Sequence, residues 1–126
     1  MGKFVISKAK TGIMFNLLAG NGEIIATSQV YKRKDTAKNG IKSVIRNSEA
    51  VIEDQTKEGY KVEKCPKFEI YKDKRGEFRF RLRAQNGQII ATGESYTDIN
   101  GVKNGVNSIK RNATESAKIV DETTQD

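Results

Sequence analysis

The stretch Asn21–Tyr31 reads NGEIIATSQVY, and it returns sixty-five positions later as NGQIIATGESY at Asn86–Tyr96. The match continues without a gap to Asn47 in the first copy and Asn112 in the second. A repeat of this kind indicates that each copy is one supersecondary unit. The identical pairs along it are Asn21/Asn86, Gly22/Gly87, Ile24/Ile89, Ile25/Ile90, Ala26/Ala91, Thr27/Thr92, Tyr31/Tyr96, Lys38/Lys103, Asn39/Asn104, Gly40/Gly105, Ser43/Ser108, Arg46/Arg111 and Asn47/Asn112.

Strand patterns surround each repeated stretch. Ile13–Ala19 and Phe78–Ala84 place apolar residues at every second position, which predicts strands with one buried face. The Asn-Gly pairs that follow, at Asn21 and Asn86, predict type I′ hairpin turns with positive φ at both central residues. A shorter strand is expected before each of these period-two strands, with Phe4 and Ile6 in the first copy and Phe68 and Ile70 in the second. The repeated Ile-Ile-Ala-Thr stretch after each Asn-Gly turn is the third strand, so each copy begins with three strands joined by turns.

A helix is expected after the third strand of each copy. Ala37, Ile41, Val44 and Ile45 are spaced as i, i+4, i+7 and i+8, which is typical of a helix that lays one apolar stripe on a sheet. Gly40 lies inside this helix, where glycine costs about 1 kcal/mol relative to alanine. Its presence favours a close approach of the helix to the sheet.

A short closing strand is expected after each helix, at Val51–Asp54 and at Ile119–Glu122. The pattern is therefore β-β-β-α-β, written twice. We expect the first repeat to span residues 1–56, a charged connector to span 57–67 and the second repeat to span 68–126. Both repeats are expected to form one compact domain of the α+β class.

The composition narrows the range of functions. The 126 residues carry a formal net charge of +7, which favours an anionic partner without defining a site. No histidine is present, so the commonest general base and a frequent metal ligand are missing. The single cysteine, Cys65, has no partner for an internal disulfide, and neither a membrane-spanning run nor the apolar segment of a signal peptide is seen. We expect a cytoplasmic protein with no catalytic residues, no cofactor and no metal.

The order of these residues resembles the YegP-like family of small prokaryotic proteins, which carry a domain of unknown function. The resemblance rests on the Asn-Gly hairpin, the Ile-Ile-Ala-Thr strand, the tyrosine and the helix with Asn-Gly-Ile or Asn-Gly-Val, and it covers both copies. It implies a single antiparallel sheet with both helices on one side and with the closing strands exchanged between the repeats. It also implies a monomer with an internal pseudo-two-fold axis, and it supplies no catalytic or ligand-binding residues.

The first candidate site is a row of arginines. If Phe78 and its alternating neighbours face the helices, then Arg79, Arg81 and Arg83 face away, about 7 Å apart along the strand. With Tyr71 on the same face, they could form a platform for a single-stranded nucleic acid or another polyanion. The alternative is a solvated face on which the arginines pair across strands with Glu69 or Glu94.

The second candidate site is apolar. Met14 and Leu18 occupy the outward positions of the first copy, and with Val5 they could form a partner surface. The alternative is that the three side chains cover one another as a small separate cluster.

Three functions remain open at this point. The first is an interaction module of undetermined role that is not an enzyme. The second is weak, sequence-tolerant binding of nucleic acid or another polyanion through the arginine face. The third is a small-molecule binder or enzyme that uses a groove between the two helices, which would need a concave site with converging polar groups.

Overall fold

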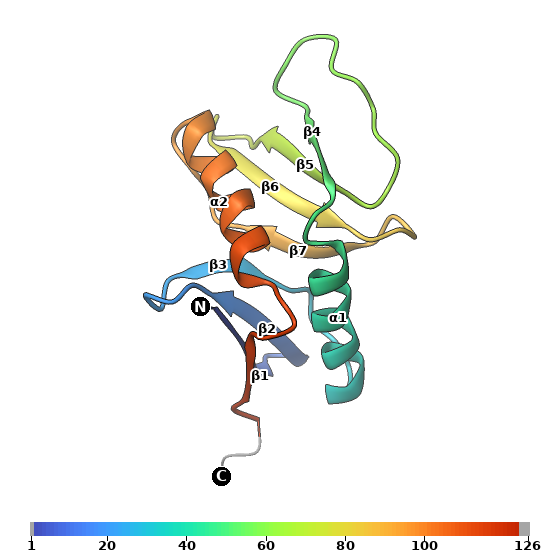
Figure 1. The fold of residues 1–126 in the computed structure, drawn as a ribbon, viewed down its shortest axis with the longest axis vertical. Coiled ribbons are helices and arrows are strands. Elements are labelled where there is room, and N and C mark those ends of the chain that lie inside the picture. Colours follow the sequence, from blue (N-terminus) through green and yellow to red (C-terminus); the bar gives the residue numbers. More distant parts are fainter. Residues whose placement is uncertain (1, 124–126) are drawn as a thin grey trace.

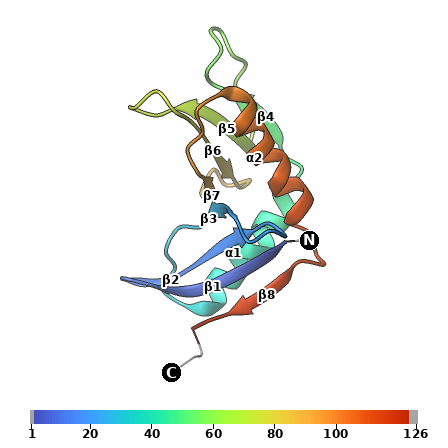
Figure 2. The ribbon, with the colours of Figure 1, turned by 90° about the vertical axis from the view of Figure 1, so that its left-hand side faces the viewer.

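The structure is a computed structural model, and it describes residues 2–123. In this part of the chain eight strands form one sheet, and two helices lie against one face of it (Figure 1). Figure 2, turned by 90°, shows α2 on one side of the strands and β8 beside β1. The elements are β1 (Lys3–Ala9), β2 (Gly12–Leu18), β3 (Ile24–Thr27), α1 (Lys34–Asn47), β4 (Val51–Asp54), β5 (Lys67–Lys72), β6 (Phe78–Arg83), β7 (Ile89–Gly93), α2 (Ile99–Asn112) and β8 (Lys118–Asp121).

The sheet is mixed, with the strand order β4-β5-β6-β7-β3-β2-β1-β8. The six inner strands pair antiparallel, but β4 pairs parallel with β5 and β8 pairs parallel with β1. The expectation of an entirely antiparallel sheet is therefore wrong at both edges. Parallel neighbours need a connection of about a dozen residues or more, and the long loop 55–66 between β4 and β5 provides one (Figure 1).

The two Asn-Gly hairpins are tight turns, but the predicted type I′ geometry is wrong. Gly22 has a φ of 87° and Gly87 a φ of 86°, whereas no described residue other than glycine has a positive φ. The Gly22 amide donates to the Ala19 carbonyl, and the Ala19 amide donates to the Glu23 carbonyl. This is a type I turn closed by a left-handed glycine. The Asn21 side chain accepts from the Glu23 amide at 3.0 Å and supports that geometry.

The core lies between the helices and the facing side of the sheet. It is built by alternate strand residues, as predicted, and four phenylalanines are its largest side chains. The fully buried side chains from the sheet include Phe4, Phe15, Phe68 and Phe80, and those from the helices include Ile41, Val44, Val102, Val106 and Ile109.

Neither described helix combines the length and apolar character that a membrane span requires.

Each helix approaches the sheet closely at a glycine, as expected. The Tyr96 ring stacks on Phe80 with the ring centroids 6.5 Å apart, and its hydroxyl reaches Gly105 of α2. Tyr31 occupies the equivalent place against Gly40 of α1. A β-carbon at either glycine would overlap the tyrosine hydroxyl. The repeated Tyr and Gly are therefore a packing pair, and burial raises the pKa of both tyrosines.

We predict that Gly105→Ala destabilises the protein even though alanine is the better helix former. The added methyl would overlap the Tyr96 hydroxyl and lie 3.0 Å from the Phe80 ring, so the expected loss is about 1 to 3 kcal/mol in the free energy of unfolding. Urea unfolding followed by circular dichroism measures it.

Gly101→Ala in the same helix is the matched control. Its β-carbon would lie 3.2 Å from the nearest side-chain atoms, and we expect a change below about 1 kcal/mol. Equal stability of the two variants would contradict the packing role of Gly105.

Candidate functional site

The side of the sheet away from the helices presents the candidate arginines. Phe80 and Leu82 of β6 are fully buried under the helices, and Arg79, Arg81 and Arg83 alternate with them on the other side. The register of β5 against β6 places Tyr71 opposite Arg79. The sequence therefore predicted correctly that these four side chains share one face.

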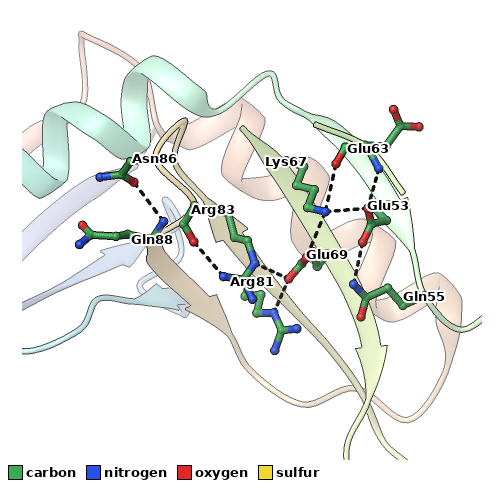
Figure 3. Close-up of polar contacts among 10 residues, drawn as sticks. Glu53, Gln55, Glu63, Lys67, Glu69, Arg81, Arg83, Asn86 and Gln88 are labelled. Atoms are coloured by element: carbon green, nitrogen blue, oxygen red, sulfur yellow. Dashed lines mark hydrogen bonds and ion pairs between the residues drawn. The ribbon is translucent and has the colours of Figure 1, made fainter. Parts of the chain in front are cut away.

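The arginines do not present free charge on that face. Glu69 of β5 accepts from Nε of Arg81 at 2.5 Å and from Nε of Arg83 at 2.7 Å (Figure 3). Arg79 pairs with Asp73 at 3.0 Å. Arg83 also donates to the Gly87 carbonyl at 2.8 Å. Pairing across strands with Glu69, the alternative drawn from the sequence, is the arrangement seen.

A second carboxylate extends this network to the sheet edge. Glu53 of β4 is 2% exposed and lies 2.7 Å from Nζ of Lys67, which also lies 3.3 Å from Glu69. Gln55 donates to Glu53 at 2.6 Å, and the backbone amide of Glu63 donates to it at 2.7 Å (Figure 3). Glu53 therefore ties both ends of the loop 55–66 to the sheet. We call Glu53, Lys67, Glu69, Arg81 and Arg83 the ion-pair network.

The network keeps its members charged. Burial raises the pKa of Glu53, but hydrogen bonds from Lys67, Gln55 and the Glu63 amide outweigh it and lower the pKa to about 2. Burial likewise raises the pKa of Glu69, but the hydrogen bonds from Arg81 and Arg83 outweigh burial and lower it. The hydrogen bond to Glu53 raises the pKa of Lys67. The positive charges on this face are thus largely offset by two buried carboxylates.

Tyr71 is also partly engaged. The Arg81 guanidinium lies over its ring, 4.4 Å from the centroid, which is a cation–π contact. One side of the ring is therefore covered by a neighbour within the chain. A base could stack only on the remaining side, so the aromatic platform imagined from the sequence is smaller than expected.

The apolar candidates occupy the corresponding place in the other half of the sheet. Val5 lies opposite Asn16 in the register of β1 and β2, with Met14 and Leu18 two positions away on β2. On its other side Val5 pairs with Val120 of β8. These three side chains are half-buried and lie near one another on the face away from the helices. Nothing on this face identifies a partner.

The feature that the sequence reading missed is the distribution of net charge. The segment α1 contains four basic residues and one acidic residue, and α2 contains three basic residues and no acidic one. The helices therefore carry +6 of the formal +7. The signal was present in the sequence, but it appears only when charge is counted for each element. Among residues 2–123, no group of three metal-ligating side chains is assembled.

These observations define an α+β protein with a mixed eight-stranded sheet, one helical layer and a charged face. The family described as a domain of unknown function, DUF1508, matches residues 9–54 and 73–121, and the chain belongs to that family. The UPF0339 protein PA0329 of Pseudomonas aeruginosa is 41% identical over 121 residues, which is 95% of this chain and 96% of that protein. The family description assigns no function.

Two further relatives bear on the fold. The solution NMR structure of yegP from E. coli, a protein of unknown function, matches with a TM-score of 0.78 at 33% identity and covers 99% of this chain and 96% of that one. The YegP-like resemblance is therefore confirmed. A UPF0339 protein of Treponema denticola is 51% identical over 53 residues, which is 42% of this chain but 91% of that protein.

We predict that the network makes stability depend on pH in acid. The pKa of Glu53 is lowered from 4.5 to about 2 on folding, so its stabilising effect is complete above about pH 4.5 and is lost as the pH falls toward 2. Glu53→Gln should remove this part of the slope. It should also destabilise the protein at pH 7 by about 2 kcal/mol, because Lys67 loses its nearest carboxylate.

Urea unfolding at several pH values tests this, with Glu58→Gln as the matched control. Glu58 lies in the loop 55–66 that follows β4, and its side chain is exposed. A slope in Glu53→Gln equal to that of the wild type between pH 4.5 and 2 would rule out Glu53 as the group responsible.

Proposed function

We propose that this protein acts by binding rather than by catalysis, and that its helical layer binds polyanions such as single-stranded nucleic acid. The observation that carries the proposal is the location of the net charge, of which the two helices hold +6. Lysine and arginine contacts to phosphates supply affinity that does not depend on sequence. A basic layer on one side of the molecule also steers an anionic polymer toward that side.

Charges within the layer are available for contact. Lys38 and Lys42 are exposed on α1 and lie one turn apart, about 6 Å along the helix axis. Lys103 takes the equivalent position of Lys38 on α2. None of the three pairs with a carboxylate of another described residue, whereas Lys34 lies 2.9 Å from Asp121.

The arginine face is the second candidate surface for the same function. Arg79 favours it, because its side chain is 42% exposed and its partner Asp73 belongs to a surface turn. Against it, Arg81 and Arg83 would have to leave Glu69, a buried carboxylate, to reach a phosphate. Lys38, Lys42 and Lys103 of the helical layer have no such competition within the described residues.

The architecture that we propose is a fused pair of half-units whose closing strands are exchanged. Three observations support it: the repeat in the sequence, the pairing of β4 with β5 and of β8 with β1, and a relative in Treponema denticola of about half the length. The pseudo-two-fold axis would pass between β3 and β7, and the fused chain would be a monomer. The free thiol of Cys65 supports a cytoplasmic location.

We predict that a helical variant, Lys38→Gln/Lys42→Gln/Lys103→Gln, weakens binding of labelled single-stranded DNA and RNA. Fluorescence anisotropy across a salt series measures both affinity and the salt dependence. If all three lysines contact phosphates, the slope of log affinity against log salt should fall by about 2.

The matched variant is Arg79→Gln/Arg81→Gln/Arg83→Gln, which removes the same three charges from the other side. It should change the salt slope little. Because it leaves Glu69 without its arginine partners, its folding is checked by circular dichroism, and Arg79→Gln alone is the milder substitute. A loss of slope only in the arginine variant would move the site to the sheet face, and no binding at low salt would reject the proposal.

A further inference from the structure

Two hollows on the helical side of the molecule have matching walls. The larger one, of about 530 Å³, lies between α2 and the turn that joins β2 to β3. We call it hollow A. Its polar lining comes from Asn21, Glu23, Tyr96, Asn104, Ser108, Arg111 and Asn112.

The smaller one, hollow B, has a volume of about 230 Å³ and lies between α1 and the turn that joins β6 to β7. Each hollow is therefore formed by the helix of one repeat and the hairpin turn of the other. Five lining positions are identical in the two hollows, and they are Ala19/Ala84, Asn21/Asn86, Ser43/Ser108, Arg46/Arg111 and Asn47/Asn112.

Part of this repeated lining has a structural role. Asn112 donates to the Ser108 carbonyl at 2.8 Å and to its hydroxyl at 3.2 Å, and Asn47 makes the same two bonds to Ser43 at 2.9 and 3.3 Å. These bonds fix the side chains at the end of each helix. They explain why Asn and Ser recur, and they shape both walls in the same way.

The repeated arginines have no such explanation among residues 2–123. Arg46 and Arg111 are exposed, and neither side chain forms an ion pair or a hydrogen bond with another described residue. A cation in the last helical turn interacts favourably with the helix dipole. A lysine or arginine at any of several positions in that turn would provide this interaction, so it does not explain why arginine recurs at one position. Here the guanidinium stands at the same place in the wall of both hollows.

One difference between the two linings accompanies the difference in size. Hollow A is lined by Gly20, and the equivalent lining residue of hollow B is Gln85. A glutamine side chain occupies space that the glycine leaves open. Gly20 does not have a positive φ, so a side chain could be added there without backbone strain.

We propose that hollows A and B are a pair of binding sites for the anionic group of a small molecule, a carboxylate or a phosphate. Arg111 in hollow A and Arg46 in hollow B would pair with the anion, because guanidinium binds both groups in a bidentate manner. Hollow A lies within the usual range of small-ligand pockets. Its carboxylate Glu23 opposes a second negative charge and selects ligands with one anionic group.

The inference is independent of polyanion binding, which was assigned to Lys38, Lys42 and Lys103. It also differs from the groove between the helices considered from the sequence, because each hollow here joins one helix to a hairpin turn.

The test is a two-dimensional 15N–1H NMR titration of the full chain with inorganic phosphate, N-acetylglycine and adenosine monophosphate as probes. We expect saturable shifts of the Ser108 and Asn112 signals for hollow A and of Ser43 and Asn47 for hollow B. Arg111→Gln should weaken binding at hollow A about tenfold and leave hollow B unchanged. Tighter binding of phosphate or of N-acetylglycine would identify the anion.

Gly20→Gln distinguishes binding inside hollow A from general attraction of an anion to the positive charge of the protein. It keeps every charge but fills hollow A, so it should weaken binding there about as much as Arg111→Gln does. Lys57→Gln is the control, because it removes one exposed charge from the loop 55–66, outside both linings. Shifts that do not saturate, or binding at hollow A that survives Gly20→Gln, would overturn the proposal whether or not nucleic acid binds.

Discussion

The pairing of β3 with β7 is the contact on which the rest of the structure depends, because it joins the two halves of the sheet. Its register is short, with Ala26 opposite Gly93 and Thr27 opposite Thr92. A β-carbon at Gly93 would overlap the buried Phe80 ring. Helix packing reinforces the junction, since α1 contacts β2 and β7 while α2 contacts β6 and β3. Each helix therefore bridges both halves and holds the central strands together.

This arrangement gives the two sides of the sheet different chemistry. The helical side carries nearly all of the net charge and both hollows, while the other side carries paired charges and an apolar cluster. The charged residues of one half and the apolar residues of the other occupy equivalent positions in the sheet. Glu53, Glu69 and Arg83 correspond to Val120, Val5 and Leu18. The outer face of one half carries ion pairs, and the outer face of the other carries apolar side chains.

Local patterns in the sequence predicted most of the fold. Period-two runs located β2 and β6, helical spacing located α1, and the repeat located the second copy. The parallel edges were not predicted, because the direction of β4 beside β5 depends on where a long loop returns the chain. For the site, alternation placed the arginines on one face, but it could not show that Glu53, from another strand, completes a network that holds their charge.

Residues that are identical in the two copies lie in the core and on the helical side of the molecule. Residues that differ between the copies lie on the outward face of the sheet. Shared residues build the core, the Tyr–Gly packing pairs and the walls of the hollows. The outward positions of β2 and β6 differ completely, with Met14, Asn16 and Leu18 in place of Arg79, Arg81 and Arg83. A surface that used both halves in the same way would need equivalent side chains in each. Only the helical side meets that condition, so any function that follows the internal symmetry belongs there.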